Sequence, residues 1–111
     1  MENEDWKKLF ESEIGQAEKA RAEGNEGKAR VCARRAAGLV AGEYLSRQSL
    51  SPPGHSTYSR LQYLQSLPKV SPKVREAAHY FLMRITPEHK LPIEIDLIAE
   101  ARWLKETLLD D

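Results

Sequence analysis

Arg84 and His89 are separated by four residues in the C-terminal third of the chain, a pair that could act on a phosphodiester. A guanidinium can hold a phosphate through two hydrogen bonds, and an imidazole can transfer a proton near neutral pH. Pro87 lies between them and places His89 in a loop, so a helix does not fix their mutual geometry. We therefore treat Arg84 and His89 as catalytic candidates only, and the catalytic residues stay unknown.

The other reactive side chains form no recognised motif. His55 and His79 show neither HExxH spacing nor an accompanying cysteine or carboxylate pattern, so the sequence predicts no metal site. His55 follows Pro-Pro-Gly at the expected start of a helix, where it could cap the helix or contact a ligand. Cys32 lies among small residues, and we expect a buried thiol because a nucleophile needs a neighbouring base.

Neither a cofactor nor a membrane is expected. No GxxxxGK[ST] or GxGxxG loop occurs, and GNEGK at residues 24–28 follows a predicted helix instead of a strand. The acidic N-terminal sequence is unlike a signal peptide, and no stretch reaches the roughly 20 apolar residues of a membrane span. A single cysteine cannot form an internal disulfide, which favours a reducing, cytoplasmic location.

Apolar residues spaced by three and four predict the helices that must position these side chains. The predicted helices cover Asp5–Glu23, Glu26–Arg47, His55–Leu67, Pro72–Ile85 and a last segment that begins near Ile93. We expect Gly24 to end the first helix, Asn25 to cap the second, and Ser71 to cap the fourth. No alternating run predicts a strand. These features predict one domain over residues 1–111, an all-α, up-and-down bundle of four to five helices.

Two glycines, Gly38 and Gly42, lie four residues apart in the second predicted helix. Each costs up to about 1 kcal/mol relative to alanine inside a helix. Such a cost suggests that the backbone of another helix approaches closely here. The alternative is that both glycines are merely tolerated.

The charge of the chain is balanced in total but not along its length. With 17 Lys and Arg against 17 Asp and Glu, the formal net charge is zero, which excludes a histone-like or polybasic membrane-surface protein. Residues 28–90, here called the basic middle, hold 11 Lys and Arg against 3 Glu, whereas the ends are acidic. The basic middle could form an anion-binding face, or its charges could pair with those of neighbouring helices.

Four passages resemble the HEPN family (higher eukaryotes and prokaryotes nucleotide-binding domain). They are AEKARAEGNEGKARVCARRAAGLVAGEYL, GHSTYSRLQYLQSL, SPKVREAAHYFLMRITPEHKLP and DLIAEARWLKETL. In order, they are similar to the family's alanine-rich second helix, its His-Ser segment with a leucine-rich helix, its next helix with a proline-bearing loop, and its final helix. The resemblance implies a helical homodimer that often works beside a minimal nucleotidyltransferase in toxin–antitoxin systems and binds nucleotide or RNA.

Two departures from the family bear on function. Where relatives often have Gln-Ala-Ala-Glu followed by lysine, this chain has Arg35-Ala36-Ala37-Gly38 followed by Gly42. The family's ribonuclease branch carries Arg-x4-6-His on a helix with a polar residue after the arginine, whereas here Ile85 and Pro87 follow Arg84. The resemblance therefore favours a binding domain over an enzyme.

The residues that the resemblance implies as anion contacts are few. Arg34, Arg35 and His55 are the ligand-binding candidates, and Arg84 and His89 are further contacts near the second proline-bounded loop. We predict a non-catalytic domain that dimerises and binds a nucleotide, RNA or a partner protein such as a minimal nucleotidyltransferase. One alternative is a metal-independent ribonuclease using Arg84 and His89. Another is a helical-hairpin interaction module, because EGNEGKA resembles a tetratricopeptide turn, although no 34-residue repeat follows.

Overall fold

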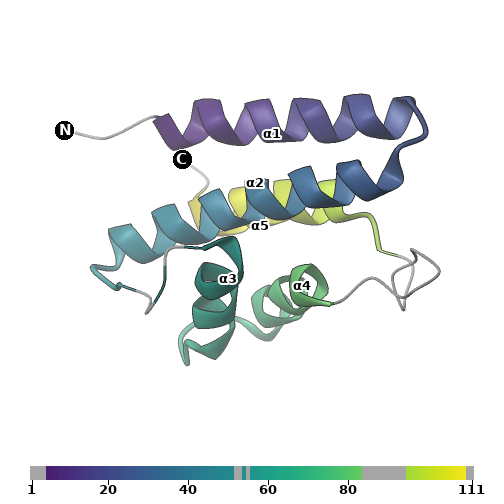
Figure 1. The fold of residues 1–111 in the computed structure, drawn as a ribbon. Helices are drawn as coiled ribbons and strands as arrows, with labels where there is room; N and C mark the ends of the chain where they lie inside the picture. Colours follow the sequence, from purple (N-terminus) through teal and green to yellow (C-terminus); the bar gives the residue numbers. More distant parts are fainter. Residues whose placement is uncertain (1–4, 52–53, 55, 84–94, 110–111) are drawn as a thin grey trace.

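The computed structural model describes residues 5–51, 54, 56–83 and 95–109, and Figure 1 shows their arrangement. The helices are α1 (Asp5–Ala22), α2 (Glu26–Arg47), α3 (Thr57–Ser66), α4 (Pro72–Leu82) and α5 (Leu97–Leu109). No strand occurs in this described part of the chain. The predicted all-α helical bundle is confirmed.

The long helix α2 is the centre of the bundle. It packs against α1, α5 and α3, while α4 packs mainly against α3 (Figure 1). Small side chains on α2 allow three helices to approach it, because its buried residues include five alanines together with Cys32 and Gly38. These alanines are Ala29, Ala33, Ala36, Ala37 and Ala41. The predicted burial of Cys32 is confirmed, since it is 1% exposed.

Larger side chains from the surrounding helices fill the space that the small residues of α2 leave. Fully buried examples are Phe10 and Ile14 of α1, Leu64 of α3, Phe81 of α4 and Leu104 of α5. The core is therefore built of large residues from α1, α3, α4 and α5 that pack around the small residues of α2.

The turn between α1 and α2 follows the prediction from its glycine and asparagine. Gly24 has a φ of +81°, and the N–H of Asn25 donates to the carbonyl of Ala20 at 2.7 Å, which closes the end of α1. The side-chain oxygen of Asn25 then accepts the N–H of Lys28 at 3.1 Å and caps α2. This short connection makes α1 and α2 antiparallel, as predicted.

Capping residues set the starts of the later helices. Ser71 caps α4 by accepting the N–H of Val74 at 3.2 Å, and Pro72 is the first helical residue, as predicted. The expected start of the last helix near Ile93 differs from the structure, in which Asp96 accepts the N–H groups of Ile98 and Ala99. α5 therefore begins at Leu97.

The start of α3 also differs from its prediction. The sequence pattern places it at His55, which lies outside the described residues, whereas α3 begins at Thr57. Ser56 provides the cap, because its hydroxyl accepts the N–H of Ser59 at 3.0 Å. Apolar spacing alone therefore predicts this helix but begins it too early.

The dimensions fit a chain of this length. The radius of gyration is 13.5 Å, close to the roughly 13 Å expected for a compact chain of about 100 residues. Among the helices of the described residues, none is long and apolar enough to span a membrane.

Candidate functional site

Arg34 and Arg35 point to different parts of the molecule, because successive residues on a helix are about 100° apart. Arg34 donates from Nε to the carbonyl of Phe81 at 2.7 Å and from Nη2 to the carbonyl of Met83 at 3.4 Å. These carbonyls belong to the end of α4, where helical partners are lacking and the helix dipole is negative. Arg34 thus holds the end of α4 against α2, and the structure does not bring it together with Arg35.

Arg35 is exposed and lines a groove between α1, α2 and the start of α3. The groove has a volume of about 300 Å³, and its lining residues are Leu9, Glu13, Arg35, Leu39, Thr57 and Arg60. Arg60 brings a second guanidinium from a different helix. Two basic side chains that are distant in sequence therefore share one groove.

The glycines of α2 explain the position of Arg60. A Cβ atom at Gly42 would lie 3.0 Å from Arg60 Nη1, so the guanidinium lies directly against the backbone of α2. A Cβ atom at Gly38 would lie 2.7 Å from Thr57 Oγ1. The expectation that the backbone of another helix approaches these glycines is wrong, because side chains of α3 make the close contacts.

The groove carries more positive than negative charge. Arg35 and Arg60 face one carboxylate, Glu13, whose Oε1 is buried without a hydrogen-bond partner. Thr57 is the first residue of α3, and the N–H groups of a first helical turn add a partial positive charge. The lining side chains include no histidine or cysteine that could act as base or nucleophile. This arrangement suits the binding of an anion.

Other arginines of the basic middle are engaged within the fold. Arg75 donates to the carbonyls of Leu67 at 2.9 Å and Pro68 at 3.2 Å, and so holds the end of α3. Arg47 pairs with Glu43 at 2.9 Å, one turn earlier on α2. The charge available to a ligand is therefore smaller than the composition of the basic middle indicates.

The acidic ends of the chain are bridged by arginines of the terminal helices. Arg21 contacts both Glu26 and Asp96 at 2.9 Å, and Arg102 contacts Glu18 at 3.4 Å. The hydrogen bond to Glu26 contributes most to a raised pKa of Arg21. Partial burial opposes ionisation of Asp96, but hydrogen bonds from Arg21 and from the N–H of Ala99 outweigh it and lower the pKa of Asp96.

A second, acidic cavity lies between α4 and α5, with a volume of about 410 Å³. Glu76, Tyr80, Glu100 and Trp103 are among its lining residues. Burial raises the pKa of Glu100, and the negative charges of Glu76 and Asp96 raise it further. Like charges therefore face one another here.

Three of the predicted site residues lie outside the part of the chain that the structure describes. They are the ligand-binding candidate His55 and the catalytic candidates Arg84 and His89. Their roles stay predictions. Arg60, in contrast, was not selected from the sequence as a site residue, although the spacing of Gly38 and Gly42 was a signal that something packs closely on this face of α2.

Comparison with known proteins adds no relative. No protein-family model, curated protein or solved structure matches the chain. Within the described ranges, no three His, Cys, Asp or Glu side chains gather as a metal site would require.

Proposed function

We propose that the chain is a small HEPN-like domain that acts by binding, and that its groove between α1, α2 and α3 holds the phosphate of a nucleotide or of RNA. The observation that supports this most is the presence of Arg35 and Arg60, from two helices, in one groove at the start of α3. Guanidinium groups match phosphate oxygens in geometry and charge. Glu13 lowers the net positive charge of the groove, and the two guanidinium groups outnumber it.

A charge-matched pair of variants tests this proposal. The double variant Arg35→Gln/Arg60→Gln removes both guanidinium groups, and Lys28→Gln/Lys73→Gln removes the same charge from exposed positions elsewhere in the basic middle. Fluorescence anisotropy with labelled single-stranded RNA, and calorimetry with a mononucleotide, measure affinity at low ionic strength. We expect the groove variant to bind at least about tenfold more weakly, because hydrogen bonds to charged groups contribute about 1.5–3 kcal/mol each.

The controls distinguish binding at the groove from attraction of the ligand to the total positive charge of the protein. Circular dichroism and thermal unfolding establish that each variant is folded. An equal loss of affinity in both double variants would show that total charge, and not the groove, governs binding. RNA recovered intact after binding supports a binding domain, whereas cleaved RNA supports the alternative ribonuclease with Arg84 and His89.

Self-association is a second candidate function of the same face. Leu9 is 53% exposed beside the groove, and Val31, 40% exposed, lies one helical turn before Arg35. Exposed apolar side chains beside arginines are typical of protein interfaces. A second copy would cover them, and a partner such as a minimal nucleotidyltransferase would use the same surface.

Light scattering after size exclusion measures this self-association. We expect a dimer whose dissociation constant rises in Leu9→Glu, because the new charge would be buried against an apolar surface. Gln62→Glu, at an exposed position on α3, is the control and should leave the dimer unchanged. A strict monomer at high concentration would contradict the dimer.

A further inference from the structure

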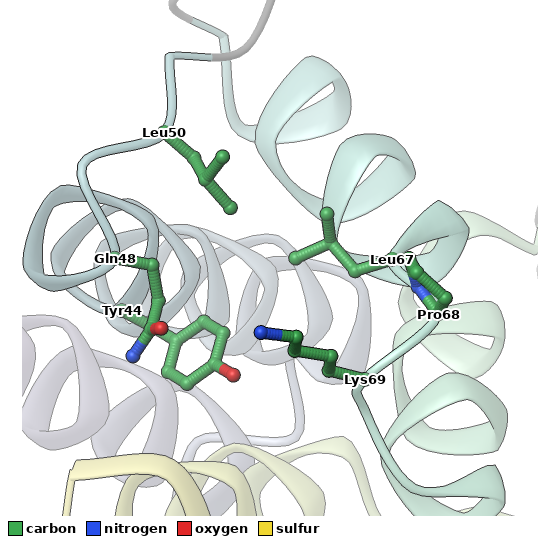
Figure 2. A pocket seen from close by; sticks show the side chains of 6 residues that line it. All are labelled: Tyr44, Gln48, Leu50, Leu67, Pro68 and Lys69. Carbon is green, nitrogen blue, oxygen red and sulfur yellow. The ribbon is translucent and has the colours of Figure 1, made fainter.

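A third cavity lies where the ends of α2 and α3 meet, away from the groove, and has a volume of about 260 Å³ (Figure 2). Its lining residues are Tyr44, Gln48, Leu50, Leu67, Pro68 and Lys69. Three of these residues are apolar, two carry neutral hydrogen-bonding groups, and one is charged. The cavity thus combines an apolar wall with a single cation.

The apolar wall is fixed by the ends of two helices. Ser49 has a φ of +57°, and the N–H of Leu50 donates to the carbonyl of Leu45 at 2.9 Å, which turns the chain back over α2. On the other side, the N–H of Leu67 donates to the carbonyl of Leu64 at 3.2 Å at the end of α3. Figure 2 shows the side chains of Leu50 and Leu67 on two sides of the cavity.

The cation is Lys69, whose amino group points across the cavity toward Tyr44 and Gln48 (Figure 2). Among the residues that the structure describes, no hydrogen bond or ion pair joins Lys69 to another group. The nearby carbonyls of Leu67 and Pro68 already accept hydrogen bonds from Arg75. Among the described residues, the ammonium group therefore has no partner of opposite charge in the cavity.

We propose that this cavity binds a small organic acid, whose carboxylate pairs with Lys69 and whose apolar body lies between Leu50 and Leu67. The volume is below the roughly 300–1,000 Å³ of pockets for drug-sized ligands, so the acid has few atoms. Tyr44 and Gln48 add neutral hydrogen-bonding groups to the lining of the same cavity. This site is separate from the phosphate groove and does not depend on it.

Three probes of equal length test the charge requirement. Hexanoate, hexanol and hexylamine share an aliphatic body and differ in the head group. In a two-dimensional NMR titration of the full chain, we expect hexanoate to shift the signals of the lining residues saturably, with millimolar affinity for so small a ligand. Hexanol or hexylamine binding as tightly as hexanoate, or no saturable shift with hexanoate, would overturn the proposal.

Two lysine variants locate the site. Lys69→Gln should weaken hexanoate binding about tenfold, as expected for the loss of a charged hydrogen bond, and Lys73→Gln should leave it unchanged. Unchanged signals elsewhere in the spectrum establish that each variant is folded. Equal binding by Lys69→Gln and the original chain would overturn the assignment.

A peptide probe distinguishes a free acid from a protein C-terminus. A tripeptide with a capped N-terminus and a free carboxylate on its C-terminal leucine has the same head group as hexanoate on a bulkier body. Tighter binding of hexanoate than of this tripeptide assigns the cavity to a small free acid. Tighter binding of the tripeptide would overturn that assignment.

Discussion

At the scale of single residues, the absence of a side chain at Gly38 and Gly42 decides where α3 lies. Thr57 packs against Gly38, and the guanidinium of Arg60 lies over Gly42. A methyl group at Gly38 would meet the branched Cβ region of Thr57, whereas one at Gly42 would meet the end of a flexible side chain. The two glycines therefore differ in how much a substitution disturbs the fold.

We predict that Gly38→Ala lowers the free energy of unfolding by about 1–2 kcal/mol, because overpacking outweighs the better helix propensity of alanine. Gly15→Ala is the matched control, since a Cβ atom at Gly15 meets nothing within 4 Å. That control should raise the free energy of unfolding by up to about 1 kcal/mol. Urea denaturation measures both, and equal stability of the two variants would contradict the packing of Thr57 on Gly38.

Glu100 should make the stability of the folded protein depend on pH. Its raised pKa means that the folded state disfavours the charged carboxylate, so the stability contributed by protonation is lost as pH rises through that pKa. Glu100→Gln should therefore be more stable than the original chain near pH 7. The difference should vanish below the ordinary glutamate pKa of about 4.3. Urea denaturation across this pH range checks the sign, and a less stable Glu100→Gln at pH 7 would contradict it.

At the scale of elements, capping side chains decide where the helices begin and end. Gly24 and Asn25 separate α1 from α2, Ser71 starts α4, and Asp96 starts α5. The first three were predictable because each has a strong local signal. The cap at Asp96 was missed because the apolar spacing continues upstream to Ile93 and Ile95. Apolar periodicity alone therefore does not show at which residue the helix begins.

We predict that Asp96→Ala lowers the free energy of unfolding by about 1–2 kcal/mol through loss of the cap and of the contact with Arg21. The pKa of Asp96 is lowered in the folded state, so its contribution is present above the unfolded pKa of about 3.9 and is lost as pH falls through the folded value. Urea denaturation at neutral and acidic pH should show a smaller effect in acid. A cost independent of pH would contradict a charged cap.

The presence of Arg60 in the groove is the part of the site that could not be predicted from the sequence. The helix that carries it was predictable from its leucines, but the face that this helix turns toward α2 depends on contacts between distant residues. Arg35 was selected from the sequence, and Arg34 was selected beside it, yet the two separate because adjacent helical residues diverge. Elements were therefore easier to predict than the grouping of their side chains.

At the scale of the whole molecule, the fold pairs some of the charges that sum to zero in the sequence and groups others. Arg21 and Arg102 join the two acidic ends, through Asp96 and Glu18 respectively. Exposed ion pairs of this kind each contribute only about 0–1 kcal/mol, so they add little to the stability of the fold. Arg35 and Arg60 remain together in the groove between α1, α2 and α3.

A double-mutant cycle on Arg35 and Arg60 tests most directly whether the two act as one site. The affinity for a mononucleotide is measured for the original chain, Arg35→Gln, Arg60→Gln and the double variant. Two guanidinium groups on one phosphate should be coupled by at least about 0.5 kcal/mol, so that the double variant loses less affinity than the sum of the single losses. Additive losses, or losses no larger than that of Lys28→Gln, would contradict a shared phosphate site.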